Sequence, residues 1–152
     1  MSSRTKHWTR DELVVMLDEV WVEYPRRLSA LPLDAQARFA QQQGYARSQD
    51  LLAHLGAWLE EAVRVMPYLQ RDERPPRSYA NDQQFNAWAV ERFADASPID
   101  VEAWYEQQRR AVKQLIQQLP DEALEVKRVY RWLVGTIVEH YDEHPLPEGD
   151  SQ

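Results

Sequence analysis

Apolar residues recur every three or four positions over several long stretches of this 152-residue chain, and this period restricts its fold more than any other feature. The spacing places apolar side chains on one face of an α-helix, whereas the alternation typical of strands is almost absent. Proline-bearing or polar breaks separate the stretches. The sequence therefore predicts an all-α chain whose helices bury their apolar stripes against one another.

Four long helices and one short helix are expected. A polar, proline-rich connection over residues 70–82 and a short helix over 83–94 separate the second long helix from the third, so this connection is a long crossover rather than a hairpin. These features predict a four-helix bundle, in which binding sites are built from side chains on facing helices. The four long helices are expected over residues 9–28, 48–69, 97–119 and 126–144.

Local signals mark the ends of these helices. Thr9 and Glu12 predict a capping box at the start of the first helix, and Ser48 and Ser97 are expected to cap the second and third. Pro67 is expected to kink or end the second helix, because proline cannot donate a backbone hydrogen bond. The inward stripe of the first helix is predicted to be Leu13, Leu17, Val20, Tyr24 and Leu28.

Composition narrows the possible partners. The length predicts one domain over residues 1–145, followed by a flexible tail over 146–152. A net charge of −7 disfavours a nucleic-acid partner, which would need a concentrated basic face. No stretch of eighteen apolar residues and no signal-like start is present, so we expect no membrane partner and a cytoplasmic location. The chain has no Cys, so any metal must be held by His, Asp or Glu.

Three of the four histidines continue the apolar stripes. His140 and His144 stand one turn apart on the last helix, where they follow Ile137 in the same inward rhythm. His54 falls on the inward stripe of the second helix. His7 joins no stripe and is expected to be solvated.

Three imidazoles in one apolar seam would leave acceptor nitrogens without partners, at a cost of about 1–3 kcal/mol per group. One divalent ion would satisfy all three and would keep a coordination position open for water or substrate. Two alternatives remain open. The histidines are hydrogen-bonded core residues, or His140, Glu143 and His144 form the inverted zinc-peptidase motif H-x-x-E-H. Only eight residues follow that motif, too few for the further ligand such peptidases need.

Three segments, LLAHLGAWLEEAV, FNAWAVERFADASPIDVEAWYEQQRRAV and WLVGTIVEHYDEH, together resemble the DinB-like superfamily. The resemblance extends from Asp11 to His144 and is closest to the ClbS/DfsB and maleylpyruvate-isomerase-like branch. It implies an up-down-down-up four-helix bundle, often a homodimer. It also implies that His54, His140 and His144 bind Zn²⁺ or Ni²⁺.

What the resemblance implies about activity is broader, because one fold hosts many chemistries. Two classes stay open. The first is a metal-dependent enzyme, a thiol-S-transferase or a hydrolase, that acts on a small electrophilic substrate with water or a low-molecular-weight thiol. The second is a non-catalytic stress-response or binding protein with a vestigial or structural metal site. The bundle accounts for nearly the whole chain and leaves no C-terminal domain, so isomerase activity is not expected.

Trp58, Asn86 and Tyr141 are predicted to line a cofactor or substrate pocket beside the histidines. Trp58 lies one turn beyond the histidine of the second helix, so ordinary core packing is an equally good interpretation. Glu61 is expected to be solvated, because the inward position there belongs to Ala62. The acids of the last helix are also expected on a solvated face: Glu139, Asp142 and Glu143.

Overall fold

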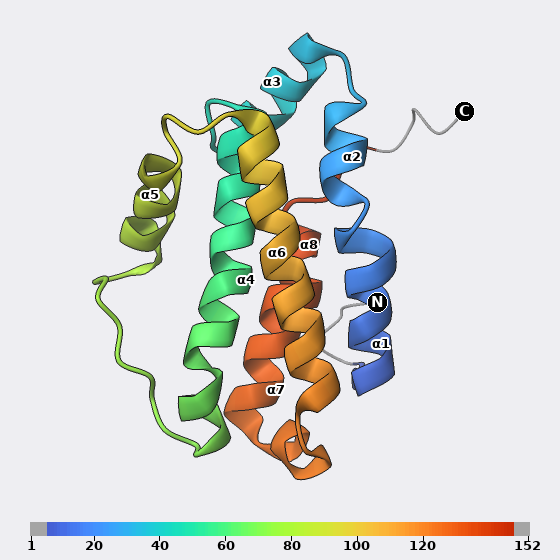
Figure 1. Ribbon diagram of the computed structural model, residues 1–152, viewed down its shortest axis with the longest axis vertical. Coiled ribbons are helices and arrows are strands. Elements are labelled where there is room, and N and C mark those ends of the chain that lie inside the picture. Colours follow the sequence, from blue (N-terminus) through green and yellow to red (C-terminus); the bar gives the residue numbers. More distant parts are fainter. Residues whose placement is uncertain (1–5, 148–152) are drawn as a thin grey trace.

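The computed structural model describes residues 6–147, and all regular secondary structure in that range is helical. Figure 1 shows long helical arms packed together, with α5 outside them beside α4. The helical elements are, in chain order, α1 (Arg10–Val15), the π-helical η2 (Met16–Trp21), α2 (Tyr24–Ser29), α3 (Leu33–Gln42), α4 (Ser48–Gln70), α5 (Asp82–Arg92), α6 (Pro98–Gln118), the 3₁₀-helical η3 (Asp121–Glu125), α7 (Lys127–Val134), the π-helical η4 (Gly135–Glu139) and α8 (His140–Glu143).

The arms run up, down, down and up. In Figure 1 the chain ascends from α1 to α2, descends through α4, descends again through α6 and ascends from α7 to α8. Between α4 and α6 it returns along the outside of the bundle and through α5, as expected for a long crossover. The all-α four-helix bundle predicted from the sequence is therefore confirmed.

Helix α4 lies at the centre of the bundle, and all seven residues from Leu51 to Ala57 are buried. Helix α6 packs closely on it at Gly56, where an added Cβ would lie 2.5 Å from the ring of Trp104. Pro67 does not end α4, which continues to Gln70. The exposed proline ring costs one backbone hydrogen bond near the helix terminus, and the surrounding packing holds the remaining turn.

The first arm is not a regular α-helix along its length. A π-helical segment from Met16 to Trp21 widens one turn and so shifts the inward face. As a result Trp21 occupies the core, with 1% of its surface exposed, whereas Val20 is only half-buried. The prediction that Val20 lies in the inward stripe is therefore wrong. The rest of that stripe is buried as predicted: Leu13, Leu17, Tyr24 and Leu28.

Two of the three predicted caps are confirmed. Thr9 and Glu12 make both reciprocal hydrogen bonds of the capping box, and the side chain of Ser97 caps α6. Ser48 is instead the first residue of α4, and its hydroxyl donates to Gln36 Oε1 at 3.3 Å. The packing of α3 against α4 thus diverts this hydroxyl from the capping role.

The ordered chain extends past the last helix. Leu146 is 5% exposed and packs against the core, although the flexible tail was expected to begin there. Residues 148–152 of that predicted tail lie outside the described residues.

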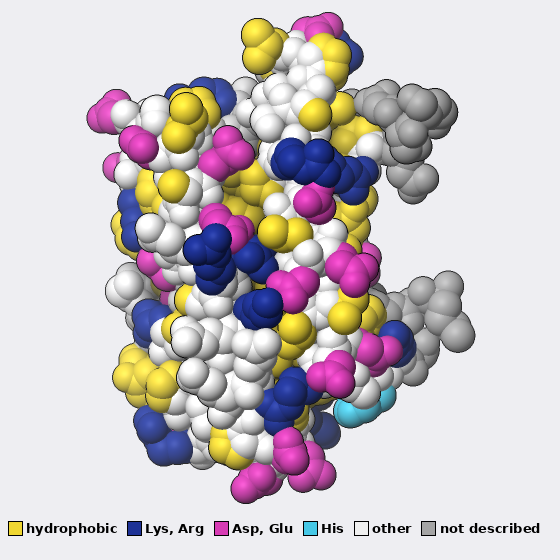
Figure 2. Space-filling view, turned by 45° about the vertical axis from the view of Figure 1, so that its right-hand side comes forward, with side chains coloured by type: hydrophobic (Ala, Val, Ile, Leu, Met, Phe, Trp, Pro, Cys, Tyr) yellow, Lys and Arg dark blue, Asp and Glu magenta, His cyan; other side chains and the backbone are white. Residues whose placement is uncertain are grey.

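The described surface is mixed in charge. On the face shown in Figure 2, acidic and basic side chains are interspersed around small apolar areas. Ion pairs on the described surface include Lys113 with Asp18 at 2.9 Å. Among the described helices, none has the length and apolar character required to cross a membrane.

Candidate metal centre

Three histidines from two arms converge inside the bundle. His54 lies in the first half of α4, His140 begins α8, and His144 follows directly after α8. Nε2 of His54 is 2.9 Å from Nε2 of His140 and 3.2 Å from Nε2 of His144. One ring nitrogen from each histidine lies within 4.8 Å of the others. The fourth histidine, His7, is exposed as predicted and stacks on Tyr130.

The π-helical segment η4 directly precedes His140. Such segments inside α-helices are frequent at functional sites, because the widened turn redirects side chains. The carbonyl of Ile137 within η4 accepts a hydrogen bond of 2.7 Å from Trp21 Nε1 on the first arm. This bond anchors the segment, and His140 is held in the core with 8% of its surface exposed.

The proton positions on His54 follow from its neighbours. Trp58 Nε1 lies 2.8 Å from Asn86 Oδ1, and an indole nitrogen can only donate, so the amide oxygen of Asn86 must face it. The same oxygen lies 3.0 Å from His54 Nδ1. His54 therefore donates from Nδ1, and its Nε2 carries a lone pair in the neutral ring.

His144 is arranged in the same way. Its Nδ1 lies 2.7 Å from Gln43 Oε1 and donates to that oxygen, which leaves a lone pair on Nε2. The Nε2 atoms of His54 and His144 then face each other at 3.2 Å with no proton between them. A proton on His140 Nε2 can satisfy only one of its neighbours. A divalent metal satisfies all three nitrogens, and outer hydrogen bonds from Nδ1 are typical of metal-ligating histidines, so the residues fit a metal site.

The surroundings keep the imidazoles neutral. Burial, assisted by the nearby His144, lowers the pKa of His54 to about 3. Burial, followed by the proximity of the two other rings, holds the pKa of His140 well below its usual value. Burial also lowers the pKa of His144. Since a metal binds only the deprotonated nitrogen, protons do not compete for this site at neutral pH.

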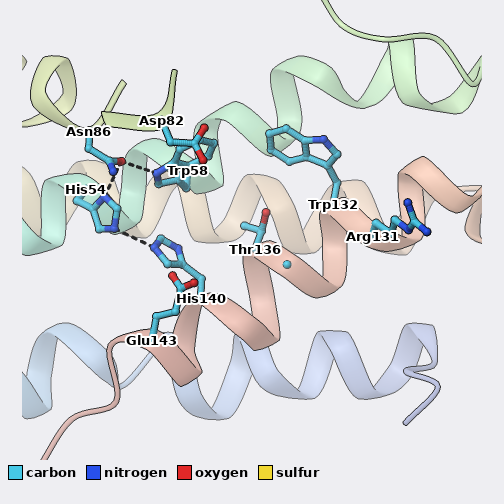
Figure 3. A pocket seen from close by; sticks show the side chains of 10 residues that line it. His54, Trp58, Asp82, Asn86, Arg131, Trp132, Thr136, His140 and Glu143 are labelled. Atoms are coloured by element: carbon cyan, nitrogen blue, oxygen red, sulfur yellow. Dashed lines mark hydrogen bonds between the residues drawn. The ribbon is translucent and has the colours of Figure 1, made fainter. Parts of the chain in front are cut away.

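A pocket of about 340 Å³ opens beside His54 and His140 (Figure 3). Its walls come from α4, α5 and the last arm. Trp58 and Asn86 both line it, and the same two residues set the tautomer of His54. Trp58 also packs on Phe85, so the packing interpretation and the pocket interpretation both apply to it.

Tyr141 does not line this pocket. Its ring lies edge-on against Trp21 and Tyr24 of the first arm. The prediction of Tyr141 as a pocket residue is therefore wrong. Glu143 is exposed, as expected, but it faces the pocket next to His140.

The prediction that Glu61 is solvated is also wrong, since only 5% of its surface is exposed. Tyr79 donates to its carboxylate at 2.7 Å, and Arg64 donates two hydrogen bonds of 2.7 and 2.6 Å. The crossover and α5 cover this side of α4, which a single inward stripe does not anticipate. These residues border a second cavity of about 730 Å³. This second cavity is larger than the pocket beside His54 and His140. The candidate site is nevertheless the smaller pocket, because the histidine nitrogens converge there.

Comparison with protein families adds an independent observation. The family described as the DinB superfamily matches residues 16–145. The chain belongs to the DinB superfamily. Comparisons with curated proteins and with solved structures found no match. The DinB match spans all three histidines, so the predicted superfamily is confirmed together with the fold.

Several residues of this DinB site were missed by sequence reasoning. Gln43 lies in the connection before α4 and reaches His144 from a hundred residues away. Thr136 and Trp132 line the pocket, together with Arg131 and Asp82. The only sequence signal for the three on the last arm is their spacing from His140, which alone does not distinguish a pocket from a solvated face.

Proposed function

We propose that this chain binds a divalent transition metal, zinc or nickel, through His54, His140 and His144. The observation that carries the proposal is the fixed tautomer of His54. Because Trp58 and Asn86 hold the proton on Nδ1, the Nε2 lone pair must point at the other two rings. Three imidazole ligands do not select between zinc and nickel, so the availability of each metal decides which one is bound.

We further propose that the chain is a metal-dependent enzyme acting on a small electrophile. The open pocket beside His54 and His140 supports this proposal over a purely structural metal. Three protein ligands leave a position from which a metal activates water or a thiol. The aromatic face of Trp58 packs against the bound molecule, and Asn86 holds the His54 ring in place.

Within the superfamily, the ClbS/DfsB and maleylpyruvate-isomerase-like branch is the proposed affiliation. It is supported by the histidine followed by tryptophan in α4 and the H-x-x-x-H spacing at the end of the chain. A low-molecular-weight thiol is the co-substrate of the transferase reaction, and water that of the hydrolase. The homodimer and the cytoplasmic location stay predictions.

Metal analysis of the untagged protein tests the metal. We expect about one zinc or nickel ion per chain in the wild type and in His7→Ala, and loss of the metal in His140→Ala. His7→Ala is the matched control, since it removes the one histidine outside the site. Equal metal content in His140→Ala and the wild type would contradict the proposed ligands.

Activity needs a separate test. Metal-loaded protein is screened with aryl esters and with electrophiles in the presence of small thiols, next to His54→Ala. Turnover that is lost in His54→Ala supports the enzyme. Stoichiometric metal without turnover, combined with a large loss of thermal stability on chelation, would favour the structural role instead.

A further inference from the structure

The pocket beside the histidines is charged differently at its two ends. Glu143 lies beside His140 and Asp82 lies beside Trp58, whereas Arg131 lies at the end farther from the histidines (Figure 3). A carboxylate near Asp82 and Glu143 is repelled in the absence of other charges, and one near Arg131 is attracted. The pocket therefore gives a bound anion a preferred direction.

Arg131 has no ion-pair or hydrogen-bond partner among residues 6–147. Its neighbour on the same helix, Arg128, pairs with Asp72 at 3.1 Å, and other arginines of the bundle, such as Arg109, are also paired. A guanidinium presents five donors in a planar fork that suits a carboxylate. Arg131 thus offers an unused anion-binding group at the edge of a pocket.

The stretch between Arg131 and the histidines is suited to a flat apolar group. Trp58 and Trp132 form an aromatic wall, with ring centroids 6.1 Å apart. Gly135 lies along the same stretch, and a Cβ added to it would meet only Glu139 Oε1 at 4.0 Å, so space is open above it. The hydroxyl of Thr136 and the indole N–H of Trp132 are polar side-chain groups of the last arm between the two ends of the pocket.

The length of this stretch restricts the ligand. Arg131 and His140 are nine residues apart on the last arm, which corresponds to about 13 Å along a helix. A ligand that reaches from the histidines to the guanidinium must therefore be elongated. A compact anion would occupy only one end.

We infer that the pocket takes an elongated substrate with a carboxylate at one end, bound by Arg131, a flat apolar middle on Trp58 and Trp132, and its reactive group at the histidines. This inference rests on the proposed function, because it describes the substrate of the same pocket. In the metal-free protein, Asp82 and Glu143 disfavour the reversed orientation. Arg131 acts here as a specificity residue that does not touch the reacting atoms.

The test uses 4-phenylbutanoate and its neutral counterpart 4-phenylbutanamide as probes of the chelated, metal-free protein. Without metal the carboxylate has no other cation in the pocket to bind. Dissociation constants are measured by ligand-observed NMR titration for the wild type, Arg131→Gln and the matched control Arg128→Gln. We expect the acid to bind about fivefold more tightly than the amide in the wild type and in Arg128→Gln, and equally in Arg131→Gln.

A second variant tests the apolar stretch. Gly135→Leu fills the open space above the last arm, and we expect it to weaken both probes at least about fivefold, while Gly135→Ala changes neither by more than about twofold. Equal binding of acid and amide in the wild type, a preference that survives in Arg131→Gln, or no saturable binding of either probe would overturn the inference. Probe binding is measured without metal, so its outcome is independent of the metal analysis. A failure of this inference can therefore be told apart from a failure of the proposed metal site.

Discussion

Two sides of α4 differ in what they contact, although Gly56 and His54 are both buried. On one side Gly56 lets the ring of Trp104 from α6 approach the helix backbone, and ring carbons make this contact. On the other side His54 meets His140 and His144, whose nitrogens need a partner that the bundle itself does not supply. The first side contributes to stability by packing alone. The second side contributes less to stability, because its buried nitrogens lack partners. Such a loss of stability is common at functional sites.

The largest expected difference between the two sides is in their response to acid. The pKa of His54 is about 3 in the folded chain and about 6.5 in the unfolded chain, so between these values the unfolded state binds more protons. The metal-free protein should therefore lose stability as the pH falls from 6.5 towards 3. The expected slope is about 1.4 kcal/mol per pH unit for each imidazole that takes up a proton on unfolding.

Urea unfolding of chelated protein at pH 7, 6 and 5 measures this slope. Gly56→Ala, on the apolar side, should shift the stability at every pH by the same amount and leave the slope unchanged. A stability that is flat between pH 7 and 5 would show that the histidines are not held neutral.

Substitutions at Gly56 and Gly135, both in described helices, test the comparison further. Gly56→Ala places a methyl group 2.5 Å from the Trp104 ring, and we expect it to lower the free energy of unfolding by about 1–3 kcal/mol. Gly135→Ala meets no close neighbour and should raise it by up to about 1 kcal/mol, because alanine favours the helix. Thermal or urea unfolding of both variants at pH 7 measures the effects. Equal losses in both would mean that the two sides of α4 are packed alike.

A smaller effect is expected from the residue that orients His54. Asn86→Ala removes the acceptor for Nδ1 while leaving all three histidines in place, so metal affinity should fall by about 10- to 100-fold. Competition with a chromophoric chelator gives the affinity. Gln83→Ala, an exposed position on the same helix, serves as the control. An unchanged metal affinity in Asn86→Ala would contradict the claim that Asn86 supports metal binding by fixing the tautomer of His54.

The smallest effect is expected at the capping box, far from the site. Thr9→Ala should lower the free energy of unfolding by about 1 kcal/mol and leave metal content unaltered. Hydrogen bonds from Lys6 and then Thr9 lower the pKa of Glu12 to about 2, below its usual value. Their stabilising contribution is present above pH 4.5 and is lost as the pH falls towards 2. Thermal melting with metal analysis checks the variant, and a loss of metal would show that the two regions are coupled.

Much of the site could be predicted because its ligands follow local rules. His140 and His144 stand one turn apart after Ile137, and His54 lies on an inward stripe, so periodicity alone brought the three together. The errors arose where a residue has a neighbour from elsewhere in the chain. Glu61 is buried because the crossover covers it, and Tyr141 packs on the first arm.

The sequence by itself determined the helices, the breaks between them and the inward histidines, because helix propensity, capping and apolar period depend on residues within one or two turns. Only the tertiary structure decided which side of α4 is packed and which is open. It also decided the π-helical shift that favours Trp21 over Val20, and the protons on the histidine rings. Asn86 and Gln43 reach those rings from 32 and 101 residues away, and no local pattern encodes such contacts.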